Sequence, residues 1–425
     1  MSASPGNHSA IDAIWRIESP KLIAVLTRFT GDLGLAEDVC QDALVAALEQ
    51  WTVHGIPENP AGWLMTAAKH RAIDFFRKRQ RTGSKHEQLG RELEQRESVV
   101  PEIGLALDVT IEDDLLRLMF IACHPVISPE ARVSLTLRLL GGLTTDEIAR
   151  AFLIPEPTVA QRIVRAKRTL ARERVPFEVP QGPDFQDRLS SVLAVIYLIF
   201  NEGYAATAGE DWIRPGLCEE ALRLGRILAE LAPQEAEVHG LVSLMEIQAS
   251  RLKARIAADG EPILLLDQNR ARWDRLLIRR GLAALAKAEA IGRERGPYTI
   301  QAAIAACHAR ALTAAETDWR RVVELYGELA DAAPSPIVEL NRAVAVSMAD
   351  GPAAALAIVD ELMTDPALAE YHLLPSSRGE FLFRLGRFEE AETEFRTAAG
   401  LTANERERSL LLERAGKCRT EQPQF

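Results

Sequence analysis

The 425-residue sequence predicts an all-α protein, and three observations lead to this fold class. Aromatic residues make up only 6% of the chain, whereas the strong helix formers Ala, Leu, Arg and Glu are abundant. Apolar residues recur at helical spacing, and Gly- or Pro-containing breaks separate the helical stretches. We therefore expect two small helical domains, the second a helix-turn-helix, joined by a flexible linker and followed by a tetratricopeptide-like helical repeat domain.

Residues 11–81 are expected to form the first domain, behind a disordered N-terminal segment at residues 1–10. Helices are predicted before the break at Gly31, over 35–51 and over 61–81, with a loop at 52–60. In the third helix, aromatic residues precede a cationic run, and this combination suits stacking on unpaired bases with cations along the phosphate backbone. Core packing of the rings and a solvated cationic helix end remain the alternatives.

Residues 144–172 predict a short helix, a tight turn and a basic helix. Thr144 and Glu147 have the spacing of a capping box, so a helix should start at Thr144. Pro155 and Pro157 force the turn and suit the start of the next helix. That helix places apolar residues on one face and cations around the rest, which is typical of major-groove docking. A helical hairpin with a solvated basic face is the alternative. The apolar positions are Val159, Ile163, Ala166 and Leu170.

Composition limits the classes of function. A net charge of -11 argues against a protein that coats nucleic acid indiscriminately, so any DNA contact must be local. The five cysteines form no C-x-x-C pair, which argues against a zinc site or a disulfide framework and favours a reducing cytoplasm. No apolar run is long enough to span a bilayer, so we expect no membrane partner. No nucleophile elbow, phosphate loop or metal-ligand cluster is present, which predicts a protein that is not an enzyme, without catalytic residues, metal or cofactor.

Four blocks of the first 175 residues occur in an order that is specific when taken together. They are Ala36-Glu37-Asp38-Val39-x-Gln41-Asp42-Ala43, Asn59-Pro60-x-x-Trp63-Leu64, Arg71-Ala72-Ile73-Asp74, and the helix-turn-helix ending Val164-Arg165-Ala166-Lys167-Arg168-x-Leu170. This set resembles the extracytoplasmic function sigma factors, group IV of the sigma-70 family, in the subgroup with a large tetratricopeptide-like C-terminal extension. The resemblance implies an alternative sigma factor that binds core RNA polymerase and directs it to a promoter.

The resemblance also implies roles for individual residues. The helix matching 36–51 would dock on the clamp helices of the polymerase beta-prime subunit, and the beta flap would be a further polymerase contact. The loop at 52–59 and the helix at 63–81 would recognise and open the minus-ten element of promoter DNA, although the loop leaves the base preference open. The helix from Pro157 would read the minus-thirty-five element as duplex. The implied residues are Glu37, Asp38, Gln41 and Asp42 for polymerase; His54, Asn59, Trp63, Lys69, Arg71, Phe75, Arg77, Lys78 and Arg79 for minus-ten; and Glu156, Thr158, Gln161, Arg162, Arg165, Lys167 and Arg168 for minus-thirty-five.

Residues 82–112 are expected to be the linker, ahead of a second domain at 113–175. Two promoter boxes about one and a half helical turns apart are separated by roughly 50 Å, which one small domain cannot span. A chain of about 30 residues extends to ~100 Å and so reaches across with slack.

Residues 183–425 are helical in pattern, with weak repeats near 34 residues. Phe388, Ala391, Phe395 and Ala398 fit the tetratricopeptide template, whereas an ordinary helical bundle is the alternative. The stretch 258–274 does not match the repeat. It is interpreted either as a surface turn or as a metal or phosphate site. We expect this half to regulate initiation in cis or to bind a peptide or protein partner.

Two other classes of function remain open from the sequence. One is a conventional helix-turn-helix regulator with a helical sensor domain, and the other is an interaction scaffold whose N-terminal part is vestigial. Transcription in vitro with core polymerase separates them, because a sigma factor alone among the three predicts promoter-dependent initiation.

Overall fold

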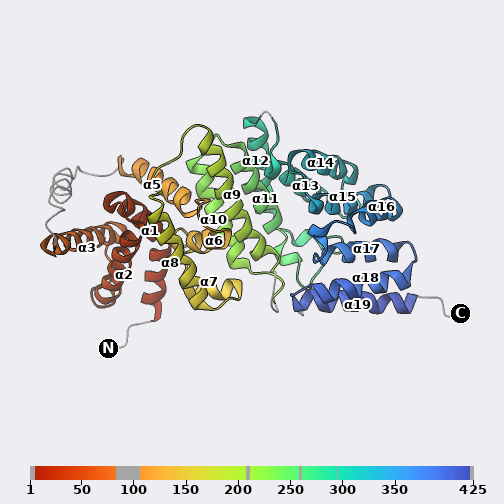
Figure 1. Cartoon of the computed structure of the whole chain (residues 1–425), viewed down its shortest axis with the longest axis horizontal. Coiled ribbons are helices and arrows are strands. Elements are labelled where there is room, and N and C mark those ends of the chain that lie inside the picture. The colour runs from red at the N-terminus through yellow and green to blue at the C-terminus, as the bar shows by residue number, and fades with distance from the viewer. Residues whose placement is uncertain (1–4, 83–105, 207–210, 258–260, 293, 422–425) are drawn as a thin grey trace. The chain divides into compact units, whose positions relative to one another are not determined.

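The computed structural model describes residues 5–82, 106–206, 211–257, 261–292 and 294–421 (Figure 1). In this part of the chain the regular elements are helices, apart from an isolated antiparallel bridge between Ile256 and Pro262. The chain divides into two compact units, residues 1–196 and 197–425. The predicted all-α fold class is therefore confirmed.

Unit 1 contains both expected N-terminal domains. The first comprises α1 (Pro5–Thr30), α2 (Leu33–His54) and α3 (Pro60–Thr82), which pack on one another. The second comprises α5 (Ala106–Ala122), α6 (Pro129–Leu139), α7 (Thr145–Phe152) and α8 (Glu156–Arg172). Helix α1 also packs against α5 and α6, so the two domains share a single compact unit.

Two expected boundaries in unit 1 differ from the structure. Helix α1 begins at Pro5, so residues 5–10 are helical and not part of a disordered N-terminus. Helix α5 begins at Ala106, which makes residues 106–112 helical where we expected a linker, while residues 83–105 lie outside the described residues. Further along α5, apolar residues such as Leu115 and Leu118 are buried.

The expected C-terminal domain began at residue 183, where α9 (Pro183–Tyr204) does begin, but the boundary between the units falls within this helix. The first half of α9 is bonded to unit 1. Arg188 donates to the carbonyl oxygen of Phe120 at 2.8 Å, and the Ser191 hydroxyl donates to that of Cys123 at 2.7 Å. Arg132 of α6 donates to the same hydroxyl at 2.8 Å. Residues 183–196 therefore belong with the second domain.

Unit 2 is a stack of antiparallel helices in which consecutive elements pack on one another. Helices α14, α16 and α18 begin at Trp319, Pro352 and Phe388, at intervals of 33 and 36 residues, as the repeat predicts. Ala391, Phe395 and Ala398 are buried in the predicted pattern. The bounds are α10 (Pro215–Leu231), α11 (Ala236–Ala249), α12 (Arg275–Ile291), α13 (Pro297–Arg310), α14 (Trp319–Ala332), α15 (Pro336–Ala349), α16 (Pro352–Leu362), α17 (Leu373–Arg384), α18 (Phe388–Leu401) and α19 (Glu405–Glu421).

Hydrogen bonds and an ion pair join the last helix of unit 2 to earlier segments of the same unit. The side-chain amide of Asn404, just before α19, donates to the carbonyl oxygens of Ala206 and Asp211 at 3.1 and 3.0 Å. Arg406 pairs with Glu261 at 2.7 Å. Bonds that join residues so distant in the sequence close the end of the stack onto its beginning, an arrangement that a simple open superhelix does not require.

In the stretch 258–274, which does not match the repeat, the described polar residues mainly bond to other parts of unit 2. Arg270 is 5% exposed and donates to the carbonyl oxygens of His308 and Ala311 and to the hydroxyl of Thr317. Asp274 caps α12 by accepting from two backbone amides. Among the residues that the structure describes, no group of His, Cys, Asp and Glu could hold a metal ion. Residues 258–260, which include the Asp-Gly pair, lie outside that part of the chain.

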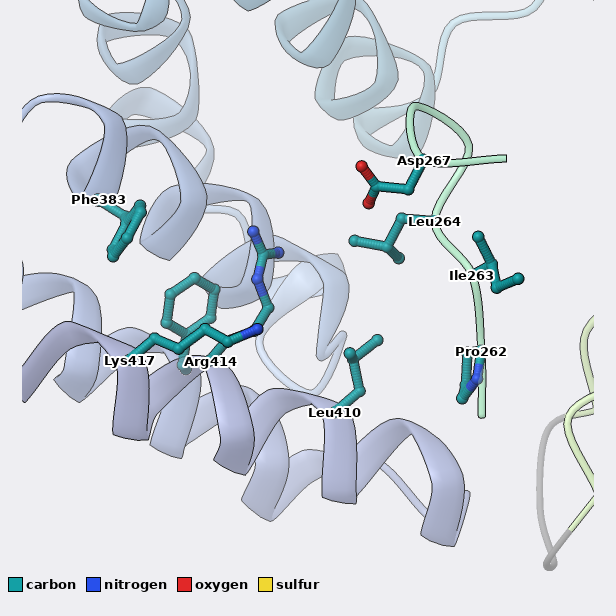
Figure 2. A pocket seen from close by; sticks show the side chains of 9 residues that line it. Pro262, Ile263, Leu264, Asp267, Phe383, Leu410, Arg414 and Lys417 are labelled. Atoms are coloured by element: carbon teal, nitrogen blue, oxygen red, sulfur yellow. The ribbon is translucent and has the colours of Figure 1, made fainter. Parts of the chain in front are cut away.

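A cavity of about 300 Å³ lies between this stretch and helices α17–α19 (Figure 2). Most of its lining residues are apolar, and the Arg414 guanidinium lies over the Phe395 ring, 4.9 Å from the ring centroid. Arg414 also pairs with Glu380, and Lys417 pairs with Glu413 at 2.8 Å. Both cations are therefore paired with carboxylates, and Asp267 adds a further carboxylate to the lining.

Candidate nucleic-acid interface

The helix-turn-helix forms as the sequence predicts. Thr144 is the N-cap of α7: its hydroxyl accepts from the amide of Glu147 at 3.1 Å, and the Glu147 carboxylate accepts from the Thr144 amide at 2.8 Å. Leu153 ends the helix in the left-handed region, with φ of 51°. Helix α8 then begins at Glu156, one residue before the expected Pro157. The four predicted apolar positions, from Val159 to Leu170, are all buried.

Replacing Thr144 with alanine should lower the stability of this domain. The change removes the hydroxyl that satisfies a free amide in the first turn of α7, and loss of such a cap costs about 1 kcal/mol. Thermal unfolding of the variant, followed by circular dichroism, should show a lower transition temperature. Thr169→Ala is the matched control, because Thr169 lies in the interior of α8 and does not cap a helix. An equal loss from both changes would contradict the assigned role of the capping box.

The candidate duplex-reading residues fall into two groups. Glu156, Gln161, Arg165 and Arg168 are exposed, whereas Thr158, Arg162 and Lys167 are partly buried. Glu156 is anchored because its carboxylate accepts from the hydroxyl of Thr145 at 3.0 Å. The exposed positions lie away from the buried apolar stripe, so α8 presents an accessible face with two arginines and one amide. Lys167 differs, because its ammonium pairs with Glu37 of α2.

The candidate polymerase-docking residues on α2 also differ in their exposure to solvent. Asp38 and Asp42 are exposed and Gln41 is partly buried, but the Glu37 side chain is only 5% exposed. Glu37 accepts from Arg138 Nε at 2.8 Å and from Gln41 Nε2 at 2.9 Å, in addition to its contact with Lys167. Burial disfavours its charged form, but Lys167 and Arg138 outweigh that effect and hold the pKa of Glu37 below its ordinary value.

The loop before α3 and the start of α3 have strong structural roles. Asn59 caps α3 by accepting from the Gly62 amide at 2.9 Å. The Trp63 ring meets the buried Trp51 ring edge-on, with centroids 5.3 Å apart, so Trp63 contributes to the core as well as to the surface. His54 is exposed at the end of α2, where its Nδ1 lies 3.2 Å from the carbonyl oxygen of Gln50.

The far end of α3 is more accessible. Phe75 is 42% exposed and meets Phe76 edge-on at 5.9 Å. Arg77 and Lys78 are exposed, whereas Lys69 and Arg71 are partly buried and Arg71 donates to the carbonyl oxygen of Ala67 at 3.3 Å. The Arg79 side chain lies outside the described residues. An exposed ring beside exposed cations fits stacking on an unpaired base near its phosphate.

Sequence reasoning missed the residues that pair across the two N-terminal domains. Arg138 lies in α6, outside every predicted set, and contacts Glu37 from 101 positions away. Arg16 of α1 likewise pairs with Glu147 of α7. A hydrophobic period or a capping pattern acts within a few turns, so no local signal could have identified these partners.

Four of the five cysteines are buried. Cys40, Cys123, Cys218 and Cys418 are buried and Cys307 is partly buried, and all five are free thiols. Burial raises the pKa of Cys123 to about 11 and that of Cys218 to about 12, so these thiols are unreactive at neutral pH. No helix among the described residues is long and apolar enough to cross a membrane.

Comparison with protein families accounts for most of the chain. Residues 14–82 match Sigma-70 region 2, residues 117–170 match Sigma-70 region 4, and residues 188–289 match a family of unknown function (DUF6596). These matches cover α1–α3, most of α5–α8, and the segment from α9 into α12, respectively.

Individual relatives show the same division. The uncharacterized protein R00370 of Rhizobium meliloti is 43% identical over 91% of this chain and 90% of its own length. The ECF RNA polymerase sigma factor SigL of Mycobacterium tuberculosis is 32% identical over 40% of this chain and 94% of SigL. The probable ECF sigma factor SigI of the same species is 24% identical over 40% of this chain and 58% of SigI. Since both sigma regions occur in order and nearly all of SigL is matched, the chain belongs to the extracytoplasmic function family of RNA polymerase sigma factors and is an alternative sigma factor that directs transcription initiation.

Proposed function

We propose that three surfaces of unit 1 divide the work of initiation: α2 docks on core polymerase, α3 with its preceding loop opens the minus-ten element, and α8 reads the minus-thirty-five element. The observation that carries this proposal is the exposed face of α8, where Gln161, Arg165 and Arg168 project from a helix whose opposite face is buried. A helix anchored in this way can enter the major groove without rearranging its own core.

The residue types on α8 suit duplex reading. Arg forms bidentate bonds with guanine, and Gln does so with adenine, so Arg165 and Gln161 are assigned to base edges. Arg168, further along the helix, is assigned to a phosphate, which positions the helix without reading sequence. Glu156 and Thr158 stand at the N-terminal end of α8, the end that such helices turn toward the bases.

The minus-ten assignment rests on the exposed end of α3. Phe75 offers a ring face for a flipped or unpaired base, and Arg77, Lys78 and Arg79 supply charge for the backbone. Asn59 and Trp63 act mainly as supports, because Asn59 caps α3 and Trp63 packs against Trp51. His54, exposed at the C-terminal end of α2 just before the loop, is also assigned to a base.

The polymerase assignment rests on Asp38 and Asp42, which are exposed four residues apart on α2 and therefore share one helix face. Adjacent Gln41 adds an amide to the same surface. The proposed partners are the clamp helices of the beta-prime subunit for α2 and the beta flap for the second domain. Asp38→Ala with Asp42→Ala should weaken core binding while duplex binding by α8 is retained.

The C-terminal unit is proposed to regulate initiation, in cis or through a peptide or protein partner. SigL is matched over nearly its whole length by 40% of this chain, so unit 2 is an addition to a two-region sigma factor. Unit 2 has its own hydrophobic cores around α11–α15 and α15–α19. A separately packed addition of this size can be removed as a unit, which makes its contribution measurable.

Truncation should be made after residue 204, at the end of α9. This variant keeps Arg188 and Ser191, whose bonds to Phe120 and Cys123 support region 4. We expect promoter-directed transcription in vitro with core polymerase to change several-fold if unit 2 is regulatory. A truncation ending at residue 182 is the control for region 4 damage, because it loses those bonds. If the variant that ends at residue 204 transcribes as the full chain does, unit 2 does not regulate this reaction.

Transcription in vitro also tests the whole proposal. Purified full-length protein added to core polymerase should produce transcripts only from templates that carry its promoter. Binding to duplex DNA with no effect on core polymerase would favour the conventional regulator instead.

A further inference from the structure

One segment of unit 2 carries positive charges that have no carboxylate partners. Residues 251–287 contain nine arginines and lysines but only four carboxylates, in a chain whose net charge is -11. Within the part of the chain that the structure describes, none of the nine cations forms an ion pair. Most cations elsewhere in unit 2 are paired, as Arg321 is with Glu324 and Arg342 is with Glu339. The segment is therefore a positive region of an acidic chain.

Helix α12 gathers four of these cations on its exposed side (Figure 1). By the helical period they fall within an arc of about 140° around the helix axis. The other side of α12 is buried and packs on α11 and α13. The exposed cations are Arg275, Arg279, Arg280 and Lys287, and the buried residues are Ile278, Gly281, Leu285 and Ala288.

The other residues on this exposed side are mostly small. Ala283 and Ala286 lie between the cations, and Leu276, which is 48% exposed, is the large apolar residue among them. A specific protein interface is usually centred on several apolar or aromatic anchors, and one leucine does not supply such a centre. Alanines allow the helix to come close to a ligand surface, and the charged ends of arginine and lysine suit phosphate oxygens. The composition of this side therefore favours a phosphate-rich ligand.

The positions of the cations on α12 are unfavourable in the free protein. Arg275, Arg279 and Arg280 stand in the first two turns, where the helix dipole favours negative charge. Arg275 and Arg279 are also four residues apart, so their like charges repel each other. The nearby carboxylates are engaged: Asp274 accepts from two backbone amides as the N-cap, and Glu289 pairs with Arg295 at 2.8 Å. A bound polyanion relieves both unfavourable effects.

We propose that the exposed side of α12 binds the phosphate backbone of duplex DNA through Arg275, Arg279, Arg280 and Lys287. We call these four residues the α12 cationic face. This contact goes beyond the proposed function, because it places a DNA-binding surface in unit 2 in addition to those assigned to α3 and α8. The face has no amide or hydroxyl side chain to read a base edge, so it contributes affinity and not sequence preference.

Duplex DNA is the polyanion that a sigma factor meets at a promoter. It carries one negative charge for about every 1.7 Å of its axis. The α12 cationic face extends about 18 Å along the helix, by the helical rise per residue, and can therefore meet several phosphates. Unit 2 is covalently joined to the domain that contains α8, so promoter binding by α8 raises the local concentration of DNA at α12 and a modest contact suffices. The net negative charge of the chain opposes binding to DNA without a promoter.

The test compares the wild-type chain, bound to core polymerase, with a variant that combines Arg275→Ala, Arg279→Ala and Arg280→Ala. All three side chains are exposed and alanine is the strongest helix former, so α12 should remain folded. Fluorescence anisotropy with a labelled promoter duplex that includes flanking DNA measures affinity at several salt concentrations. Affinity should fall at least about tenfold, and the slope of log affinity against log salt should decrease by about 2 to 3, since each phosphate contact contributes close to 1. The preference for the minus-thirty-five sequence should not change.

Two further variants calibrate the result. Arg321→Ala, Arg342→Ala and Arg396→Ala together remove the same charge from α14, α15 and α18, where each arginine is paired with a glutamate. This control variant should keep the wild-type salt slope. Lysine at all three α12 positions should restore most of the affinity, because a lysine ammonium also binds phosphate. Thermal unfolding of each variant verifies that unit 2 is folded.

Crosslinking identifies the partner of the face directly. Ala283 is exposed between the cations, so a photoreactive label at Ala283→Cys, with Cys307→Ser to remove a partly buried thiol, reports what approaches α12. In the complex of polymerase and promoter, the label should attach to DNA. Attachment to a polymerase subunit and not to DNA would assign the face to an acidic protein surface and would overturn the proposal.

The outcomes separate this inference from the proposed function. An unchanged salt slope in the folded α12 variant, or an equal decrease in the control variant, shows that the face does not bind DNA. A loss of core-polymerase affinity by the α12 variant, measured without DNA, also contradicts the proposal. If Arg165→Ala leaves sequence preference intact, the assignment of α8 fails, whereas a decrease in salt slope caused by the α12 changes still supports the contact in unit 2.

Discussion

Replacing Arg162 and Arg165 together with alanine should reduce binding to the minus-thirty-five element by at least about tenfold, because each good contact between a side chain and a base edge is worth ~1–3 kcal/mol. Promoter-directed transcription should fall in parallel. Arg165 is exposed and Arg162 partly buried on α8, and the buried stripe beneath them is untouched by either change. Fluorescence anisotropy with a labelled promoter duplex measures the effect.

The salt dependence of binding distinguishes the role of each arginine. An arginine that contacts only phosphate should, when removed, lower the slope of log affinity against log salt by about 1 and weaken all sequences alike. An arginine that reads a base should relax preference at one promoter position. Core-enzyme affinity is the control and should be unchanged, since α8 is not assigned to the clamp helices. A parallel loss of core affinity would indicate misfolding and would contradict the assignment.

Replacing Arg270 with alanine should destabilise unit 2 by roughly 3 kcal/mol, because a buried group that satisfies several acceptors is removed without a substitute. Its guanidinium donates to His308, Ala311 and Thr317, and it also stacks over the Trp273 ring at 5.1 Å. With typical urea slopes of ~1–3 kcal/mol per molar, the unfolding midpoint should fall by at least about 1 M. Tryptophan fluorescence during urea titration of the full chain follows the transition.

Arg272→Ala is the matched control for this change. Arg272 belongs to the same short 3-10 helix, η2 (Arg270–Arg272), but its side chain is exposed. Its removal should shift the midpoint little. Equal shifts from both variants would contradict the structural role assigned to Arg270. If the proposed regulatory role of unit 2 is correct, Arg270→Ala should also change transcription in the same direction as the truncation after residue 204.

Much of the candidate site could be predicted because its signals are local. The Thr144–Glu147 capping box, the prolines of the turn and the buried face of α8 are all set within a few residues of sequence. The same holds for the helix starts of the last repeats, where Phe388, Ala391 and Phe395 follow one template. In each case the backbone and its near neighbours determine the outcome, so a short window contains the physical cause.

The boundaries were less predictable. The polar stretch before α5 suggested a longer linker, but α5 already begins at Ala106. The C-terminal domain was expected from residue 183, where α9 begins, yet the first half of this helix belongs to unit 1 because Arg188 and Ser191 bond there. These bonds join segments that are distant in the sequence, so no local pattern indicates them.

The sequence by itself determined the helical class, the order of the two sigma regions and the helix-turn-helix. Only the tertiary structure decided that Glu37 meets Arg138 and Lys167, that Arg270 anchors three distant acceptors, and that Asn404 closes unit 2 onto Ala206. The physical reason is the distance along the sequence over which each kind of interaction acts. Caps and amphipathic faces act over one or two turns of helix, whereas a buried charge takes its partner from whichever segment packs against it.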